Sequence, residues 1–513
     1  MRGTLCLRSR PMGPCVLALI VACVGGARAD DAASTTAREL ARTQRELARL
    51  ERRLSDERAA TQRQLEEMQR QLRAQAQLIE RLQGQLASSA TTPGPAPTAA
   101  IAPAAVAAAA SGTPQQPPPA LQQSAPVEAR GWSPEQPIRL LGSGQAYVNL
   151  SLDTLVDFGW STTADVTELE LGDHDPNQRG FTLPNTELVL DGAVDPYFKG
   201  VANVVFKLDE NNETQVELEE SYLLSTSLPW NLQVKGGQFL TEFGRQNQQH
   251  PHAWDFVDVP LVLARVLGPE GLRNPGARIS WLAPTPFYSE VFLTMMDSQG
   301  ETAASFRDDD TIQFGRTPVS TKVGSLGDLL YVARYVLSFD LTPSQTLVAG
   351  SSWATGPNAT GQNTDTQIYG FDLYWKWKPE WQSAGWPFLS FQTEGLYRHF
   401  EAGAGPSADD PSVILPRESL HDYGFYAQAL YGFTRRWVAG VRGEYVTGDS
   451  GAFRPNPAAA DRFRFSPNLT FYPSEFSKLR LQGNYDHGQA HGDDYSVWLQ
   501  TEFLLGAHAA HKF

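Results

Sequence analysis

The sequence predicts an all-β fold, a transmembrane antiparallel β-barrel of about 16 strands, preceded by an N-terminal α-helical coiled coil. Three observations predict it. From Leu141 onward, segments of about ten residues alternate apolar and polar side chains, which is the length and pattern of a tilted membrane strand. The connections between these segments are alternately short and long. Residues 37–87 instead carry a seven-residue repeat without proline, which is typical of a coiled coil.

The composition agrees with a barrel and argues against nucleic acid as a partner. Of the 513 residues, 41% are hydrophobic and 10% are aromatic, and the mean hydropathy is -0.34. Because each membrane strand is only half apolar, a barrel gives such averages without any run of about 18 apolar residues. The formal net charge is -15, whereas binding to nucleic acid phosphates needs a basic face.

The first 29 residues have the pattern of a signal peptide. Arg2, Arg8 and Arg10 precede an apolar run at residues 16–24, and Ala27-Arg28-Ala29 is a cleavage site of the Ala-x-Ala kind. A lipoprotein box, Ile20-Val21-Ala22-Cys23, is the alternative and would leave Cys23 lipidated. All three cysteines lie in this segment, so cleavage after Ala29 leaves a chain without thiols.

Residues 37–87 are expected to form a periplasmic coiled coil. The helix could also be a lone, charged surface helix, but a long isolated helix gains little without a partner, so we expect self-association, and a trimer fits the core residues. Residues 88–136 are rich in Pro and Ala and are expected to be an extended linker. The two heptad columns consist of Leu40, Leu47, Leu54, Thr61, Met68, Gln75 and Leu82, and of Leu65, Leu72, Ile79 and Leu86.

Residues 137–513 are expected to form the barrel. Between residues 198 and 208, Phe198, Ala202, Val204 and Phe206 lie on one face, and polar residues such as Asn203 alternate with them. A soluble β-sandwich also alternates, but its strands are shorter, at about five or six residues. Long apolar faces with aromatic residues at their ends therefore favour lipid outside and water inside.

The connections predict which strand ends lie together. Short turns are expected at residues 194–196, 228–230, 284–286, 341–343, 433–435 and 472–474, and long loops at residues 157–179, 242–275, 297–327, 403–419 and 448–460. In outer-membrane barrels the short turns face the periplasm and the long loops face outward. Aromatic residues that we expect at the short-turn membrane interface are Trp230, Tyr288, Trp375, Trp377, Trp381, Trp386, Trp437 and Tyr472.

The last strand, residues 495–513, is expected to close the barrel by pairing with a first strand near residues 144–153. Its odd positions are mostly apolar and it ends on Phe513. Its even positions include Gln500, Glu502 and His508, and these residues, with Asp494 just before the strand, would face the lumen.

The stretch from Gly236 to Gly276 has the highest density of functional side chains. It is long and carries an apolar segment at residues 257–267, so we expect its central part, residues 242–275, to fold into the lumen and narrow the pore. The candidate constriction residues are Glu242, Arg245, His250, His252, Asp255, Asp258, Arg265 and Glu270. The candidate lumen residues on the wall are Glu394, Arg398, Arg442, Glu444, Arg480 and Glu502.

The plan of signal peptide, coiled coil, spacer and barrel resembles the phosphate-selective porin O and P superfamily of outer-membrane porins. The phrases FGRxNxxHPHAWxFVDxPLV (from Phe243) and GxEGLxxxG (from Gly268), with the ending GAHxAHKF, look like the proteins labelled zinc-regulated outer-membrane receptors. The resemblance implies a channel in the outer membrane of a Gram-negative bacterium. It also implies contact with the lipid bilayer and lipopolysaccharide, and a homotrimer.

Against the receptor label, we expect no separate plug domain between the spacer and the first strand, and about 16 strands are fewer than the about 22 of plugged transporters. Passive diffusion of small solutes or ions into the periplasm is therefore the expected mechanism.

The receptor label raises the question of a metal site. His250 and His252 are two residues apart, with Glu242, Asp255 and Asp258 nearby, and such ligands suit Zn²⁺. The alternative is that the two histidines donate hydrogen bonds to carboxylates of the barrel wall. No other cofactor is expected, and no nucleophile elbow or Ser/His/Asp grouping indicates an enzyme.

The charges favour a channel that is cation-leaning or weakly selective. The chain has few lysines, whereas Asp308-Asp309-Asp310, Asp409-Asp410, Asp493-Asp494 and the glutamates 217, 219 and 220 are acidic. Acidic vestibules concentrate cations, which puts phosphate selectivity in doubt. Two alternatives to the channel remain, a zinc-linked metal-uptake receptor and a structural tether that contacts the cell wall through the coiled coil.

Overall fold

The computed structural model describes residues 137–506, except residues 144, 170, 171, 210, 309, 310, 321, 455, 490 and 491. The predicted signal peptide (1–29), coiled coil (37–87) and linker (88–136) lie outside the described residues, as do His508, His511 and Phe513. No helix within the described part of the chain is long and apolar enough to cross a membrane.

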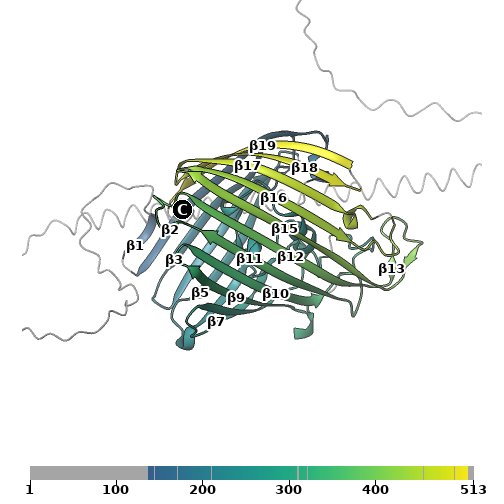
Figure 1. Cartoon of the computed structure of the whole chain (residues 1–513). Coiled ribbons are helices and arrows are strands. Elements are labelled where there is room, and N and C mark those ends of the chain that lie inside the picture. Colours follow the sequence, from purple (N-terminus) through teal and green to yellow (C-terminus); the bar gives the residue numbers. More distant parts are fainter. Residues whose placement is uncertain are drawn as a thin grey trace, which may run out of the picture. The chain divides into compact units, whose positions relative to one another are not determined.

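The described chain forms a closed antiparallel β-barrel (Figure 1). Its 17-stranded sheet consists of the short strand β1 and a ring of the other 16 strands, in which each strand pairs with its neighbours along the chain and β19 pairs with β2. The prediction of an all-β antiparallel barrel of about 16 strands is therefore confirmed. The strands are β1 (Ile138–Ser143), β2 (Ala146–Ser161), β3 (Gly180–Ala193), β4 (Phe198–Leu208), β5 (Thr214–Ser225), β6 (Leu232–Leu240), β7 (Arg273–Leu282), β8 (Tyr288–Met296), β9 (Leu330–Thr342), β10 (Gln345–Pro357), β11 (Asp365–Trp377), β12 (Phe388–Ala402), β15 (Glu418–Thr434), β16 (Trp437–Gly448), β17 (Arg462–Ser474), β18 (Ser477–Gly488) and β19 (Gly492–Leu505), with a small separate pair, β13 (Gly405–Pro406) and β14 (Ile414–Leu415), in a loop.

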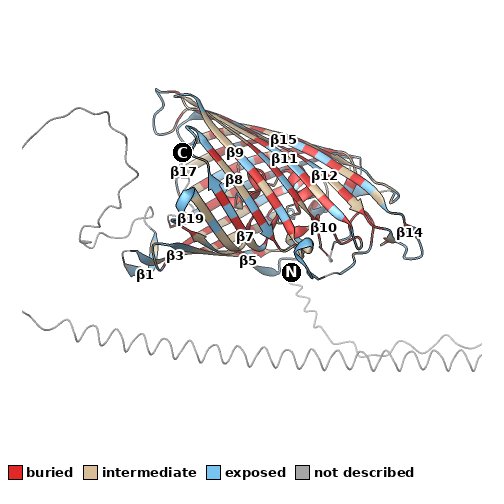
Figure 2. Ribbon diagram, turned by 90° about the horizontal axis from the view of Figure 1, so that it is seen from below, coloured by how far each residue is buried: buried red, intermediate tan, exposed pale blue. Residues whose placement is uncertain are grey.

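The alternation of side chains determines which face of each strand points inward. Along β19, Asp494, Gln500 and Glu502 are buried, whereas Val497 and Phe503 are exposed. Figure 2 shows the same alternation of buried and exposed positions along the other strands. The wall therefore has an apolar outer face and a polar inner face, as a membrane barrel requires.

Ring closure uses a different part of the first long strand from the one predicted. β19 pairs with β2 from Ser496 opposite Ser161 to Leu505 opposite Leu152, so residues 152–161 form the closing edge. The earlier residues of β2 pair with β1 instead. The expectation of a partner near residues 144–153 and of a loop beginning at residue 157 was wrong, because Asp157 to Ser161 continue the alternation and belong to β2.

The strand ends differ in the length of their connections. Each predicted short turn joins two strands at one end of the barrel, which we call the short-turn end; the opposite end, the long-loop end, carries residues 162–179, 241–272, 297–329, 403–417 and 449–461. Exposed aromatic residues mark the short-turn end, including Trp230 and Tyr288. Trp386 and Tyr472 were wrongly assigned to this girdle: both pack with Phe388 in an apolar cluster, and Trp386 is buried.

A second aromatic row, which was not among the predicted interface residues, lies towards the long-loop end. Tyr369, Tyr397 and Tyr423 are exposed and stand opposite one another on β11, β12 and β15. Trp160 and Phe181 extend the exposed aromatic surface at this end on β2 and β3. Aromatic residues at both ends of an apolar band are the pattern of a membrane barrel with two water interfaces.

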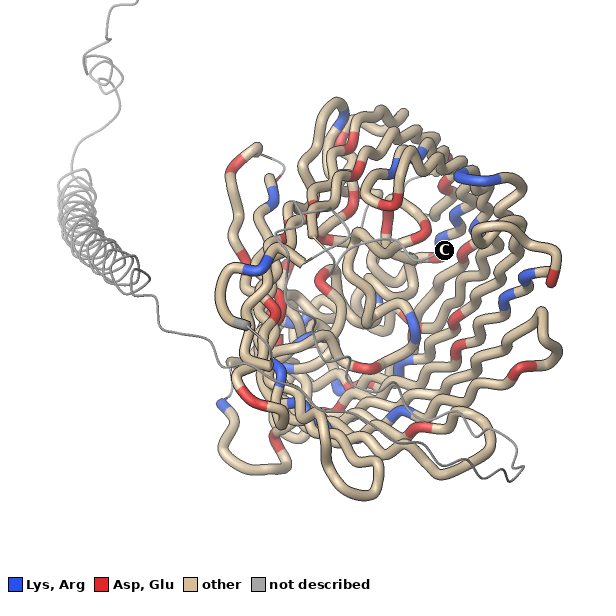
Figure 3. The backbone as a smooth tube through the Cα atoms, turned by 90° about the vertical axis from the view of Figure 1, so that its left-hand side faces the viewer, with Lys and Arg blue, Asp and Glu red and all other residues tan. Residues whose placement is uncertain are grey.

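Residues 241–272, here called the inward loop, fold into the barrel between β6 and β7. Backbone segments cross the interior of the ring of strands in Figure 3. The inward loop contains η3 (Gln246–Gln248), η4 (Pro251–Ala253) and the helix α2 (Leu261–Leu267). Every residue of α2 except Arg265 is buried, and its apolar side chains form the largest core cluster with wall residues such as Phe239, Leu396 and Val446.

Candidate functional site

The inward loop is held by polar wall residues along most of its length. The predicted range of 242–275 ends slightly too late, because Arg273 to Pro275 belong to β7. Burying a loop backbone requires partners for its N–H and C=O groups, and here the wall side chains supply many of them.

A β-bulge in β5 places two consecutive carboxylates on the inner face. Asn203 of β4 stands opposite Glu220, but the next residue of β4, Val204, stands opposite Leu218. Glu219 is thus the extra residue, and both Glu219 and Glu220 are buried. Without a bulge, neighbouring residues of a strand point to opposite faces, so this irregularity creates the pair.

His250 of the inward loop lies between these two glutamates. Its Nδ1 is 2.9 Å from Glu219 Oε2, and its Nε2 is 3.0 Å from Glu220 Oε2. Asn203 donates to Glu219 and to Glu187, which fixes both carboxylates. Burial alone lowers the pKa of His250, but the charges of Glu219 and Glu187 and the hydrogen bonds to the two β5 glutamates hold its pKa well above the ordinary value of 6.5. The geometry therefore favours an imidazolium that donates from both nitrogens.

His252 occupies a similar position one step further along the loop. Its Nδ1 is 3.0 Å from Glu187 Oε2 and 3.6 Å from Asp153 Oδ2. Its ring stacks on His250 with centroids 5.8 Å apart. Burial lowers the pKa of His252, but the charge and hydrogen bond of Glu187, followed by the charge of Asp153, raise the pKa overall. Glu187 thus connects the two histidines, and the structure shows the hydrogen-bonded arrangement with wall carboxylates.

The same cluster also contains groups with metal-ligand spacing. Ligand atoms of Asp153, Glu187 and His252 lie within 4.8 Å of one another, as do those of Glu187, Glu219 and His250. Nitrogen and carboxylate ligands suit Zn²⁺, and a bound cation would replace the protons that now bridge these groups.

Asp258 is the most heavily bonded carboxylate of the inward loop. Its Oδ2 accepts from Arg464 Nη1 at 2.7 Å and from Asn484 at 3.2 Å, and its Oδ1 accepts from Arg442 and from Gln482. Burial alone raises the pKa of Asp258, but the Arg442 and Arg464 guanidiniums hold it below its ordinary value of 3.8. Asp258 therefore stays ionised and joins the loop to β16, β17 and β18.

On both sides of the two histidines, backbone N–H groups of the loop donate to wall carboxylates. The backbone N–H groups of Arg245 and Gln246 donate to Glu394 at 3.0 Å and 2.7 Å. Leu261, the first residue of α2, donates its N–H to Glu444 at 2.7 Å. Gly244 makes the first contact feasible, because its φ is 62° and a Cβ there would lie 2.1 Å from Glu394 Oε2.

Basic wall residues bind loop carbonyls that lie between these N–H groups along the chain. Lys478 donates to the carbonyl of His252 at 2.9 Å, and Arg480 donates to that of Trp254 at 2.7 Å. Lys478 also forms an ion pair with Glu502. These contacts place Arg480 next to the loop, and Lys478 connects Glu502 to it.

The remaining predicted residues lie in separate places. Apart from the stacked histidines, no two of the eight predicted loop residues bond to each other within the described part of the chain. Two of the loop glutamates form ion pairs: Glu242 with Lys235 and Arg278, and Glu270 with Lys207 and Arg273. Three other loop residues form hydrogen bonds: Arg245 donates to Gln392, Asp255 accepts from Gln428, and Arg265 donates to the carbonyl of Ala460. On the wall, Arg398 pairs with Asp422 and Arg442 pairs with Glu444. The charged residues of the loop therefore contact different parts of the wall and do not form one ring of charges.

Cavities lie on both sides of the inward loop. One of about 590 Å³ at the long-loop end is lined by Arg265 and by wall residues such as Phe400. Two others, of about 200 Å³ and about 190 Å³, include residues near the short turns, such as Lys376 and Val201. Loop residues line all three cavities, so the loop lies between the two ends of the lumen.

Several residues of this site were not among the predicted ones. They are Asp153, Glu187, Glu219, Glu220, Arg464, Lys478 and Asp486. For Lys478 and Asp486, the signal was present, because each lies an even number of residues from Arg480 on the same alternating strand, β18. Arg464 alternates in the same way with the exposed Phe463 and Phe465 on β17. For Glu219 the alternation gives the wrong face, since the bulge shifts it.

Comparison with known proteins found one similar sequence and several similar folds. No family model matches the chain. An uncharacterized protein of Aquifex aeolicus (strain VF5) is 32% identical over 354 residues, which are 66% of this chain and 71% of that protein. Among solved structures, the anion-selective porin from Comamonas acidovorans is 10% identical with a TM-score of 0.46, covering 70% of this chain and 100% of that chain. The outer membrane channel DcaP of Acinetobacter baumannii is 15% identical with a TM-score of 0.46, covering 70% and 97%.

Proposed function

The chain belongs to the same family as the Aquifex aeolicus protein, and we propose that it is a porin-like channel for passive diffusion through the outer membrane. The observation that carries the proposal is the closed ring of 16 strands with an apolar outer face and a polar inner face. A ring of this size can enclose an aqueous lumen, and closure leaves no unpaired sheet edge in lipid.

The proposed position in the membrane follows from the surface. The exposed apolar band between the two aromatic rows would contact lipid, with lipopolysaccharide around the long-loop end. The short-turn end, where β2 begins and β19 ends, would face the periplasm, where the predicted coiled coil and its contacts with the cell wall would also lie. The homotrimer is part of this proposal and depends on the coiled coil, which lies outside the described residues.

The inward loop would set the width and charge of the pathway. Most of its charges are compensated at close range: Asp258 by Arg442 and Arg464, and Glu242 by Lys235 and Arg278. Compensated charges produce a weak field in a lumen, so we propose weak selectivity, with a cation preference from the acidic outer loops. The chain would act by diffusion and not as an enzyme.

Planar-bilayer recording of the purified full-length chain tests the channel. We expect discrete conductance steps, with a cation-to-anion permeability ratio near or above one in a salt gradient. An absence of steps in both the natural chain and Asp258→Ala, which should release the inward loop, would refute the proposal. The variant is needed because a channel closed by its loop would conduct once the loop is released, whereas a barrel that is not a channel would not.

A second candidate function, a zinc-linked metal-uptake receptor, is favoured by the two groups of ligand atoms around Glu187. Isothermal calorimetry with Zn²⁺ on the full-length chain tests it. Binding that is lost in a His250→Ala/His252→Ala variant would support a metal site, whereas unchanged affinity in that variant would exclude these histidines as ligands. Zn²⁺ should compete with protons, so affinity should rise with pH.

A further inference from the structure

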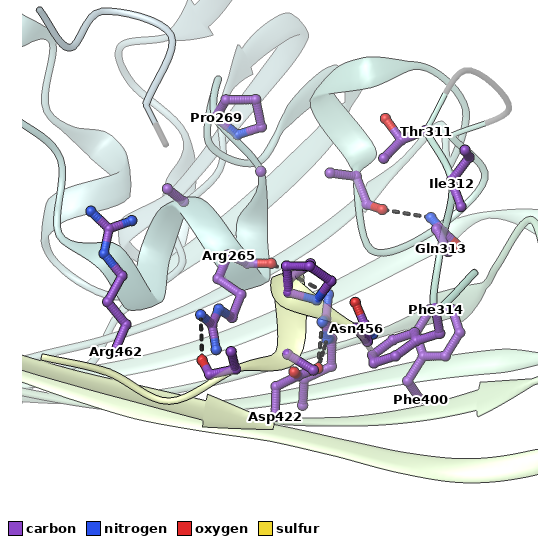
Figure 4. A pocket seen from close by; sticks show the side chains of 18 of the residues that line it. Arg265, Pro269, Thr311, Ile312, Gln313, Phe314, Phe400, Asp422, Asn456 and Arg462 are labelled. Atoms are coloured by element: carbon purple, nitrogen blue, oxygen red, sulfur yellow. Dashed lines mark hydrogen bonds and ion pairs between the residues drawn. The ribbon is translucent and has the colours of Figure 1, made fainter. Parts of the chain in front are cut away.

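The cavity of about 590 Å³ at the long-loop end has the size of a site for a small organic molecule (Figure 4). It lies between α2 of the inward loop, the loop at residues 311–314 and the loop at residues 456–461. Strand residues of the barrel complete the lining, including Arg398 and Phe400 of β12, Asp422 of β15 and Arg462 of β17.

One side of this cavity is apolar. The rings of Phe314 and Phe400 pack with centroids 4.7 Å apart, and Ile312 beside them is 58% exposed. Residues 457–460, a proline and three alanines, also line the cavity. An apolar wall of this kind gains free energy when an apolar group displaces water from it.

The backbone at Phe314 is held in an unfavourable conformation. Its φ is 50°, which a bulky residue rarely adopts. Arg316, with no exposed surface, donates to the carbonyls of Phe314 at 2.9 Å, Gly403 at 2.7 Å and Pro416 at 2.7 Å, and these bonds keep the turn in place. Such strain persists where the surrounding structure maintains it, and it is common at ligand sites.

The other side of the cavity carries one guanidinium whose bonding is incomplete. Arg398 is occupied by Asp422 and Ser305. Arg265 donates from Nη2 to the carbonyl of Ala460 at 3.0 Å, but its buried Nη1 has no hydrogen-bond partner among the described residues. Burial lowers the pKa of Arg265 to about 10, and the charge of Asp422 offsets only part of this effect. A buried donor of this kind is costly unless another group accepts from it.

We propose that this cavity binds a small amphipathic carboxylate, with its carboxylate on Arg265 and its aromatic or branched aliphatic body against Ile312 and Phe314. A carboxylate matches the planar fork of a guanidinium and supplies the missing acceptor. An inorganic anion would leave water against the apolar side of the cavity. Carboxylates such as Glu168 and Glu301 also line the cavity, but none of them accepts from Arg265 Nη1, and an organic cation could not accept from it either. The site would let a weakly selective channel bind one class of organic anion and, in that role, rests on the proposed function.

Calorimetry with 4-phenylbutyrate on the full-length chain in detergent micelles tests the site, with empty micelles as the blank. We expect saturable binding to the natural chain, and weaker binding of butyrate, which lacks the ring, and of 4-phenylbutylamine, which carries the opposite charge. Arg265→Gln should lower the affinity for 4-phenylbutyrate about tenfold or more, because it removes a charge-assisted hydrogen bond. Ile312→Ser should lower it several-fold without affecting a buried core position.

Arg417→Gln is the matched control, because Arg417 lies at the same end of the barrel, pairs with Glu401, and does not line the cavity. It should leave affinity unchanged. Equal affinity of Arg265→Gln and the natural chain, or equal binding of the carboxylate and the amine, would overturn the proposal. Because calorimetry does not need ion flow, a chain that binds 4-phenylbutyrate but never conducts would refute the channel and keep the site. A chain that conducts but does not bind 4-phenylbutyrate would refute the site and keep the channel.

Discussion

Removal of the Asp258 carboxylate should release the inward loop while leaving the barrel intact. Asp258 is buried against Arg442 and Arg464, and breaking a buried ion pair by removing one partner costs about 3–5 kcal/mol. Here the lower end applies, because each guanidinium keeps a second carboxylate: Arg442 keeps Glu444 at 2.7 Å, and Arg464 keeps Asp486 at 2.9 Å. A loss of about 3 kcal/mol shifts the ratio of released to docked loop by a factor of about 100.

The assay compares the mean conductance of Asp258→Ala with that of the natural chain, and measures protease cleavage of the loop in parallel. Both should rise, while the unfolding temperature of the barrel should change little, because the strand ladders are untouched. Asp255→Ala is the matched control: Asp255 lies on the same loop, but its partner Gln428 at 2.8 Å is neutral, so the loss should be about 1 kcal/mol. Equal conductance and protease resistance in Asp258→Ala and Asp255→Ala would refute the role of Asp258 as the main anchor.

Two further predictions concern the pH response and the wall. Because the pKa of His250 is raised, its stabilising contribution is full below pH 6.5 and is lost as the pH rises through the folded-state pKa. Conductance should therefore increase at alkaline pH in the natural chain and increase less in His250→Gln, where His252 still titrates with a raised pKa. Gly237→Ala should weaken the β5–β6 pairing and lower the unfolding temperature, because φ is 137° there and a Cβ would lie 2.1 Å from the carbonyl of Ser221. Gly236→Ala, where no atom lies within 4 Å, should have little effect, and equal unfolding temperatures would contradict the steric argument.

The wall was predictable because one rule applies to every strand. Once alternation shows which face of a strand is apolar, each polar residue of that strand is assigned to the lumen, and Arg442, Arg480 and Glu502 are indeed buried on the inner face. The rule fails where one strand has an extra residue relative to its neighbour, as at the Glu219 bulge in β5. It also fails where a polar residue is taken as the start of a loop although the strand continues past it. Asp157 is such a residue, because it points inward from a regular strand.

The partners of the inward loop could not be predicted in the same way. Asp258 and Arg464 are 206 residues apart, and their contact depends on the register of several successive strands and on the path of the loop inside the ring. Local pattern shows that residues 257–267 are apolar enough to be buried, but not which wall strands they meet. The His250 cluster depends in addition on the bulge, so neither its glutamates nor its geometry follows from spacing.

The two main anchors of the inward loop differ in how they respond to protons. Arg442 and Arg464 keep their charge at any ordinary pH, and the depressed pKa of Asp258 keeps the carboxylate ionised, so this anchor is constant. The anchor at His250 depends on a proton that is lost at alkaline pH. If only the contacts of His250 are broken, the loop stays attached near α2 through Asp258. The segment around His250 should then move while the loop as a whole stays in the lumen. If the anchors are independent, the free-energy changes of Asp258→Ala and His250→Gln should add in the double variant, and a large departure from additivity would mean that the loop is released as one unit.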